Sequence, residues 1–229
     1  MPVGIYYFYG TKTNSAMMTV APPALLPLNL TERSLAPDIL RVRATFNEYL
    51  AFAEECQYNV EYINGEIVSM SQASLTHESL VGRLIYTLIG LFDNDEQITA
   101  FSSNIKLFVE ATGDLVNADV TVVQGQPDYL RLPGDNLFTA TVKNPILIVE
   151  VLSDSTTAFD LGEKLEIYKQ IPSLQQILFV SQYKPWVISY TRMTNPIEWL
   201  NTSVHTIADS ITVLANTVAL ADIYKKITF

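Results

Sequence analysis

The stretch PILIVEVL, residues 145–152, is apolar at every position except Glu150. A continuous apolar run of this length, rich in β-branched residues, is typical of a strand that is buried on both faces of a sheet. The stretch DLGEKLEIYKQI, residues 160–171, has apolar residues at helical spacing, and two β-rich runs follow at 175–181 and 186–192. Helices that bracket such strands predict an α/β or α+β fold, with a central mixed β-sheet flanked by helices.

The chain before this strand carries further helix and strand signals. Asn64-Gly65 is the strongest two-residue hairpin signal, and it lies between β-rich flanks. Ser74 is a favoured N-cap ahead of a long amphipathic segment, and Thr112-Gly113-Asp114 is a turn between two β-rich runs. In chain order we expect a helix over 45–57, a hairpin over 58–70, a helix over 74–92, two strands over 104–123, a polar loop over 124–144 and a short helix over 221–227.

The composition bounds the class of protein. The 229 residues are 48% hydrophobic and 17% charged, which is a globular composition. Cys56 is the one cysteine, so no intramolecular disulfide can form and a reducing compartment is expected. The 24 acidic residues against 14 basic ones give a net charge of −10, which argues against broad electrostatic binding to nucleic acid or to an anionic membrane. No long apolar run and no secretory pattern is found, so we expect a cytoplasmic protein that does not enter the membrane.

The first 40 residues differ from the rest of the chain. They carry tyrosines, small residues and prolines without a sustained periodicity, so we expect an irregular N-terminal arm over 1–40 and one domain over 41–229. Met17 and Met18 are alternative physiological starts, between which the sequence does not decide.

Asp119, Glu150 and Lys164 are three charged residues that the sequence pattern makes candidates for a functional site. A lone carboxylate on the buried strand, Glu150, needs a cationic partner, a metal ion or a proton. Strand alternation places Asp119 on one face with Asn117 and Thr121, and carboxylates on neighbouring strands repel unless a cation lies between them. Lys164 lies near the centre of the apolar arc of its helix and should point toward the sheet. These residues indicate a structural ion pair or a metal-binding cleft, and we expect Lys164 to face a hydrated, metal-occupied cleft.

Three more residues are candidates for the same site. His77 is in register with the apolar face of its helix, although such a histidine is more often a hydrogen-bonded core residue than a ligand. Asp160 lies one turn before Lys164 and can pair with it. Glu61 precedes the hairpin turn and is by itself an ordinary strand carboxylate.

The Asp, the Glu in an apolar strand and the nearby Lys resemble the PD-(D/E)XK nuclease superfamily. More narrowly, the runs VEYINGEIV, NADVTVV, PILIVEVLSDST and DLGEKLEIYK, together with His77, resemble a bacterial branch described as restriction endonucleases and formerly as a domain of unknown function. The resemblance covers roughly residues 41–225. It implies a restriction-endonuclease-like fold more firmly than it implies nuclease activity, because a fold does not fix a function.

Two positions depart from the superfamily pattern. The pattern places Lys two residues after the Glu, where this chain has Leu152. Lys164 on the following helix resembles the migrated replacement found in this branch. The branch usually has Pro before the Asp, where this chain has Ala118, a substitution that keeps the carboxylate.

Phosphodiester hydrolysis by this residue set requires a divalent metal ion. Mg²⁺, or Mn²⁺, prefers oxygen ligands, which Asp119 and Glu150 would provide, with Glu61 and the backbone carbonyl of Val151 as further ligands. Lys164 would orient or deprotonate the attacking water, or stabilise the charge that develops on the phosphate. Supporting roles would fall to Glu61, His77 and Asp160.

Three functions remain open. The first is a metal-dependent DNA endonuclease, whose affinity for DNA we expect to be weak and metal-assisted because basic residues near the site are few. The second is a nuclease-fold protein that no longer cleaves and serves as a binding or assembly module, which the net charge of −10 favours. The third is a metal-dependent hydrolase of another phosphate substrate, such as a nucleotide. A homodimer is a further expectation, since many proteins of this fold are dimers.

Overall fold

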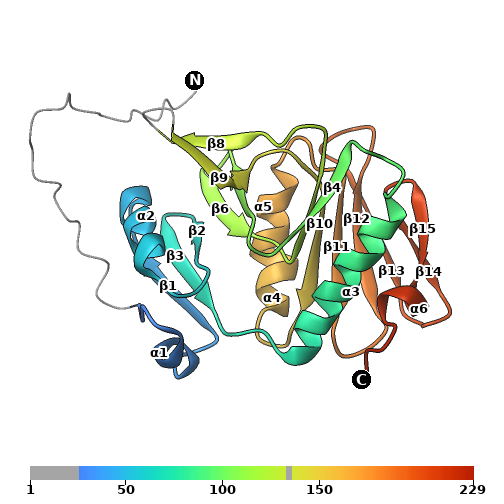
Figure 1. Cartoon of the computed structure of the whole chain (residues 1–229), viewed down its shortest axis with the longest axis horizontal. Helices are drawn as coiled ribbons and strands as arrows, with labels where there is room; N and C mark the ends of the chain where they lie inside the picture. The colour runs from blue at the N-terminus through green and yellow to red at the C-terminus, as the bar shows by residue number, and fades with distance from the viewer. Residues whose placement is uncertain (1–25, 133–135) are drawn as a thin grey trace, which may run out of the picture.

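Two β-sheets with helices packed against them form the body of the protein (Figure 1). A computed structural model of the chain describes residues 26–132 and 136–229. The sheets are mixed, because one strand pair in each is parallel and the other pairs are antiparallel. The mixed α+β architecture expected from the sequence is therefore confirmed.

The strands of the seven-stranded sheet lie within residues 39–142. Its strands lie in the order β1-β3-β2-β6-β5-β9-β8. The β2–β3 hairpin turns at Asn64-Gly65, where φ is 53° and 77°, as a two-residue type I′ turn requires. The strands are β1 (Ile39–Arg43), β2 (Glu61–Ile63), β3 (Glu66–Met70), β5 (Lys106–Val109), β6 (Asp114–Asn117), β8 (Tyr129–Leu132) and β9 (Asn136–Val142).

One face of this sheet is covered by α2 (Phe46–Glu55). Thr45 begins this helix in a capping box, because its hydroxyl accepts from the backbone N–H of Glu48 while the Glu48 carboxylate accepts from the N–H of Thr45. Tyr49 and Phe52 on the inner face of the helix are fully buried. They form a small core with the apolar residues of β3 and β6.

The six-stranded sheet has the order β13-β12-β11-β10-β7-β4, with β10 at the centre beside its parallel neighbour β11. All eight residues of β10 are buried, as the continuous apolar run predicts. A separate hairpin, β14–β15, completes the strands. The bounds are β4 (Ile98–Ser102), β7 (Val120–Gln124), β10 (Pro145–Leu152), β11 (Gln176–Ser181), β12 (Val187–Arg192), β13 (Trp199–Val204), β14 (Ser210–Val213) and β15 (Asn216–Ala219).

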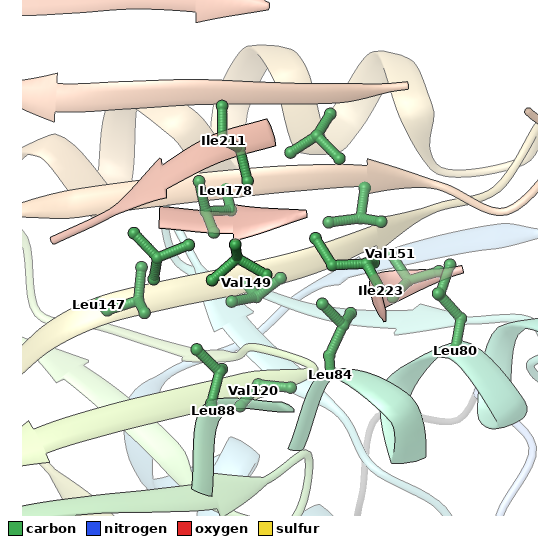
Figure 2. Close-up of a cluster of buried hydrophobic side chains, with 14 of the residues drawn as sticks. Leu80, Leu84, Leu88, Val120, Leu147, Val149, Val151, Leu178, Ile211 and Ile223 are labelled. Atoms are coloured by element: carbon green, nitrogen blue, oxygen red, sulfur yellow. The ribbon is translucent and has the colours of Figure 1, made fainter. Parts of the chain in front are cut away.

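The two faces of β10 contribute to different cores. Leu147, Val149 and Val151 pack against the long helix α3 (Leu75–Leu91) and against α6 (Leu220–Ile223), as Figure 2 shows. Ile148 and Leu152 pack on the opposite side, where the core contains residues of both sheets and of α5 (Leu165–Lys169). Because side chains alternate along a strand, Glu150 projects into this second core, between the sheets.

Most of the predicted elements are confirmed, including the hairpin and the helix that begins after Ser74. Three differences matter. Residues 104–123 form three strands in place of two, because β6 belongs to the seven-stranded sheet and β7 to the six-stranded one. The expected loop over 124–144 contains β8 and β9, which pair with each other. The expected helix after β10 is divided into α4 (Thr157–Phe159), a π-helical turn η1 (Asp160–Lys164) and α5.

The expected irregular arm over 1–40 lies largely outside the described residues. Its described part contains a short helix, α1 (Leu30–Ser34), and the start of β1, so regular structure begins ahead of residue 41. The division of the chain at residue 40 stays a prediction. Among the described residues, no helix is long and apolar enough to cross a membrane.

Candidate active site

Asp119 lies where the chain passes from one sheet to the other. Strand β6 ends at Asn117 and β7 begins at Val120, so Ala118 and Asp119 form the link. The backbone N–H of Val151 donates to Oδ2 of Asp119 at 2.7 Å, and the N–H of Asp119 donates to Oε2 of Glu150 at 3.3 Å. These two bonds hold the Asp119 carboxylate beside Glu150, although Asp119 lies in the link before β7 and Glu150 lies on β10.

Glu150 is a buried carboxylate on the central strand. Its residue exposure is 4%, and this burial raises the pKa of its carboxyl, an effect that the charge of Lys164 opposes. Oε1 of Glu150 lies 2.7 Å from Nζ of Lys164 and also accepts a hydrogen bond from the hydroxyl of Tyr168. Both oxygens of this carboxylate therefore have partners.

Lys164 lies at the end of the π-helical turn and is only 2% exposed. Its ammonium donates to the carbonyl of Asn117 at 2.7 Å, and it lies 3.3 Å from Oε1 of Glu61 and 3.9 Å from Oδ1 of Asp160. Burial by itself lowers the pKa of this lysine, but the surrounding carboxylates outweigh it and raise the pKa well above the ordinary value. The expectation that Lys164 faces a hydrated cleft is thus wrong in one respect. The ammonium borders the cleft, but it is enclosed in a buried ion-pair network.

Glu61 and Asp160 complete this network. Oε1 of Glu61 accepts from the backbone N–H of Asn117 at 2.7 Å, whereas its Oε2 is buried without a hydrogen-bond partner. Asp160 is 4% exposed, and burial raises the pKa of its carboxyl. Three carboxylates therefore surround one buried ammonium, which leaves an excess of negative charge.

His77 approaches the site from the first turn of α3. Ser74 caps this helix by accepting a hydrogen bond from the backbone N–H of His77, which sets the position of the imidazole. Nε2 of His77 lies 3.2 Å from Oδ2 of Asp119, and Nδ1 lies 3.5 Å from Glu78. Burial alone lowers the pKa of His77, but the contact with Asp119 outweighs it, and the net effect is a raised pKa.

A cleft of about 340 Å³ opens onto these groups. Of the residues expected in the site, those that line it are His77, Asp119, Glu150, Val151, Asp160 and Lys164. Glu61 lies behind them and reaches the cleft through Lys164. The structure therefore brings all the expected residues together around one ammonium and one opening.

Two residues of the site had no assigned role at the sequence level. The hydroxyl of Tyr168 is fully buried and bonds both Glu150 and the carbonyl of Asn117, the second at 3.2 Å. The side chain of Asn117 accepts a hydrogen bond from Lys106, whose Nζ lies 3.1 Å from Oδ1 of Asn117. The sequence indicates Tyr168 through its place in the run DLGEKLEIYK, which resembles the nuclease branch. Asn117 contributes through its backbone, which no side-chain pattern indicates.

The donor set meets the basic requirement of a hard divalent cation. No group of three or more His, Cys, Asp or Glu side chains among the described residues is arranged to hold a metal ion. Mg²⁺, however, is usually bound by one or two carboxylates together with waters and substrate phosphates, and Asp119 and Glu150 supply two. The residues present therefore fit such an ion, with waters and substrate oxygens completing its coordination.

The fold is that of the restriction-endonuclease-like PD-(D/E)XK superfamily. The model of the Uma2 family, described as "Putative restriction endonuclease", matches residues 46–220, which is more than half of the chain. The chain belongs to the Uma2 family. Proteins of this restriction-endonuclease-like family generally use divalent metal ions, and the family points to a nuclease that acts on nucleic acid.

Similar proteins come from cyanobacteria. The chain is 34% identical over 160 residues to "Uncharacterized protein sll1609" of Synechocystis sp., covering 70% of this chain and 86% of that protein. It is 32% identical over 134 residues to "Uncharacterized protein slr1290" of the same organism, covering 58% of this chain and 66% of that protein. A crystal structure from Anabaena variabilis, described as "a putative nuclease belonging to DUF820", superposes with a TM-score of 0.62 at 14% identity. That match covers 79% of this chain and 97% of the other, and it shows a shared fold.

Proposed function

We propose that this protein is a Mg²⁺-dependent endonuclease that hydrolyses phosphodiester bonds in DNA. The observation that carries the proposal is the pair of carboxylates, Asp119 and Glu150, fixed side by side at the cleft with Lys164 against them. Such a pair repels itself unless a cation is close. Among the described residues one ammonium, that of Lys164, is shared by Glu150, Glu61 and Asp160, while His77 contacts Asp119. Family membership supports the same class of reaction.

The two carboxylates are the proposed metal ligands, with the backbone carbonyl of Val151 as a third. The N–H of Val151 points to Asp119, and in an extended strand the N–H and C=O of one residue point to the same side. Glu61, with one free carboxylate oxygen, is a further ligand after a side-chain movement. A bound Mg²⁺, or Mn²⁺, would neutralise phosphate charge and lower the pKa of a coordinated water.

Lys164 has two proposed tasks. Its charge opposes the rise that burial causes in the pKa of Glu150, and so favours the ionised form that a metal ligand requires. It would also orient the attacking water or stabilise charge on the phosphate. Its Nζ donates to the Asn117 carbonyl and lies 2.7 Å from Glu150 and 3.3 Å from Glu61. Contact with water or phosphate therefore requires the ammonium to move away from part of this arrangement.

His77 and Asp160 are proposed as supporting residues. His77 holds the Asp119 carboxylate from the cleft side and carries a raised pKa, so its protonated form is suited to contact a phosphate oxygen. Asp160 adds negative charge near Lys164 and favours the protonated ammonium.

Cleavage assays test the proposal directly. Supercoiled plasmid, single-stranded DNA, RNA and nucleotides would be incubated with the protein in Mg²⁺, Mn²⁺ or EDTA. We expect cleavage of DNA that needs the metal and is lost in Asp119→Asn and Glu150→Gln. Glu166→Gln removes an exposed carboxylate from the same helix region and serves as the matched control. Metal-independent cleavage, or equal activity of the Asp119 and Glu166 variants, would contradict the assignment.

A non-cleaving binding or assembly module is the second candidate, and one observation favours it. The ion-pair network is already closed by Lys164, and the net charge of −10 gives little general attraction to DNA. Under this alternative no substrate is hydrolysed with any metal. A third outcome, hydrolysis of nucleotides alone, would identify a different phosphate substrate. A cytoplasmic location and a homodimer stay predictions.

A further inference from the structure

Tyr183 is an exposed aromatic side chain at the mouth of the cleft. It lies in the turn between β11 and β12 and is 50% exposed. Its hydroxyl accepts hydrogen bonds from the backbone N–H of Asp154 and from Nε2 of Gln182, each at 3.2 Å. The buried side chain of Gln182 in turn accepts from Ser74, the cap of α3, at 2.6 Å. The ring is therefore held in place although it is exposed, which lowers the entropy lost when a ligand packs on it.

A second hollow lies on the other side of Tyr183. It has a volume of about 580 Å³, within the usual size range of small-molecule sites. Tyr183 lines both this hollow and the cleft, so the two are neighbours that meet at this side chain. The hollow is walled by the apolar side chains of Leu152, Leu161 and Trp186. We call it the side groove.

The charges around the side groove favour a neutral, flat ligand over a phosphate. Asp154 and Lys184 are its charged lining residues, and their charges cancel. Lys184 lies 4.8 Å from the ring of Trp186, at the edge of the groove, where it can meet a phosphate outside it. An aromatic platform, apolar walls and one cation at the rim are the combination that binds a nucleobase and its backbone in single-stranded nucleic acid.

We propose that the side groove binds an unpaired DNA base next to the phosphodiester held in the cleft, with the base stacked on Tyr183. This inference rests on the proposed function, because the cleft must hold the backbone of the same strand. It names the substrate class more closely, as DNA with an unpaired segment at the cleavage position. Bases within a duplex are stacked on one another and cannot offer a face to Tyr183 unless they leave the stack.

Binding of DNA without cleavage tests the groove separately from the chemistry. Fluorescence anisotropy of a labelled thymidine oligonucleotide, and of a duplex of equal length, would be measured at low salt in EDTA. We expect tighter binding of the single strand. Stacking of one base contributes about 1–3 kcal/mol, so Tyr183→Ala should weaken single-strand binding roughly tenfold and duplex binding less than about twofold.

Matched variants separate stacking from loss of structure. Tyr183→Phe loses the same hydrogen bonds as the alanine variant but keeps the ring, so it should bind within about twofold of the wild type. Tyr86→Ala removes an aromatic residue that is 68% exposed on α3 and should change nothing. Binding should also quench tryptophan fluorescence, and this quenching should be lost in Trp186→Phe.

The outcomes distinguish the groove from the proposed function. Cleavage of duplex DNA with no effect of Tyr183→Ala on binding or cleavage overturns the groove and leaves the endonuclease assignment intact. Binding that depends on Tyr183 in a protein that cleaves nothing supports the groove and contradicts the endonuclease assignment. Equal weakening by Tyr183→Phe and Tyr183→Ala, or no measurable binding of the single strand, also overturns the groove.

Discussion

Replacement of Lys164 by Met removes the one ammonium at the centre of the buried network while it keeps the aliphatic stem. Glu150 and Glu61 are 4% and 2% exposed, and both lie within 3.3 Å of the lysine. Removal of one partner of a buried ion pair costs about 3–5 kcal/mol, because the remaining charge is buried without compensation. The variant can avoid part of this cost only by taking up a proton.

The free energy needed to protonate the buried glutamate sets the expected loss of stability in Lys164→Met and the pH dependence of that loss. A glutamate has an ordinary pKa of 4.5, so protonation at pH 7 costs about 3 kcal/mol at roughly 1.4 kcal/mol per pH unit. In the variant the folded state then holds Glu150 protonated while the unfolded chain holds it ionised. Folding takes up a proton, so the free energy of unfolding falls as the pH rises above the unfolded pKa. Burial already raises the pKa of Glu150 in the wild type, where Lys164 opposes the rise, so we expect a loss of at most about 3 kcal/mol at pH 7 that shrinks to under about 1 kcal/mol at pH 5.

Urea unfolding of the wild type and of Lys164→Met at pH 7 and pH 5, followed by circular dichroism, measures both values. Lys169→Met is the matched control, because this lysine lies on α5 and pairs with an exposed glutamate. That pair should contribute well under about 1 kcal/mol. A Lys164→Met variant as stable as the control at pH 7, or a loss that does not change with pH, would refute the buried network as described.

Three further predictions follow from the same contacts. Asp119→Asn keeps the shape of the side chain but removes the charge, so we expect any metal-dependent cleavage to fall by at least about 100-fold in a plasmid assay, with little change in melting temperature. DNA binding by the wild type should be weak in EDTA and clearly tighter with added metal, whereas tight binding in EDTA with a steep salt dependence would contradict this prediction and point to a basic DNA-binding surface. Burial lowers the pKa of Lys106 to about 8 from its ordinary 10.5. Between these pH values the unfolded chain binds more protons than the folded one, so the free energy of unfolding rises with pH. Urea unfolding should therefore show that the stability of the wild type, relative to Lys106→Met, rises from pH 8 to pH 10. A fall over this range would contradict the burial of the Lys106 ammonium.

The central elements could be predicted because their signals are local. Strand β10 is apolar at nearly every position, and Asn64-Gly65 has the positive φ values that a type I′ turn requires. The side-chain hydroxyl of Ser74 caps α3 as expected of a favoured N-cap residue. In each case the residues that determine the element lie within it, so tertiary contacts did not override them.

The passage of the chain between the sheets could not be predicted in the same way. Asp114–Gln124 has the alternation of one strand, with no Gly or Pro to indicate a break at Ala118-Asp119. The break is determined by partners far away in the sequence, since β6 pairs with β2 and β5 while β7 pairs with β4 and β10. This link is also what frees the backbone N–H of Asp119 to bond Glu150. The local sequence pattern therefore does not indicate the break between β6 and β7, which positions the carboxylate of Asp119.

The ionisable residues Glu150 and Lys164 could be found from the sequence because each interrupts an otherwise apolar pattern. A glutamate in an apolar strand and a lysine in an apolar arc are costly unless they have partners, which makes them visible in the sequence. Tyr168 does not interrupt the pattern, because its ring is one of the apolar groups on the buried face of the helix. Its hydroxyl alone contacts the site, where it donates a hydrogen bond to Glu150. Asn117 acts through its backbone N–H and C=O, which every residue except proline possesses. The network that holds Lys164 thus depends on two groups that leave no local anomaly in the sequence: Tyr168 is indicated by the family resemblance alone, and the backbone groups of Asn117 by the fold alone.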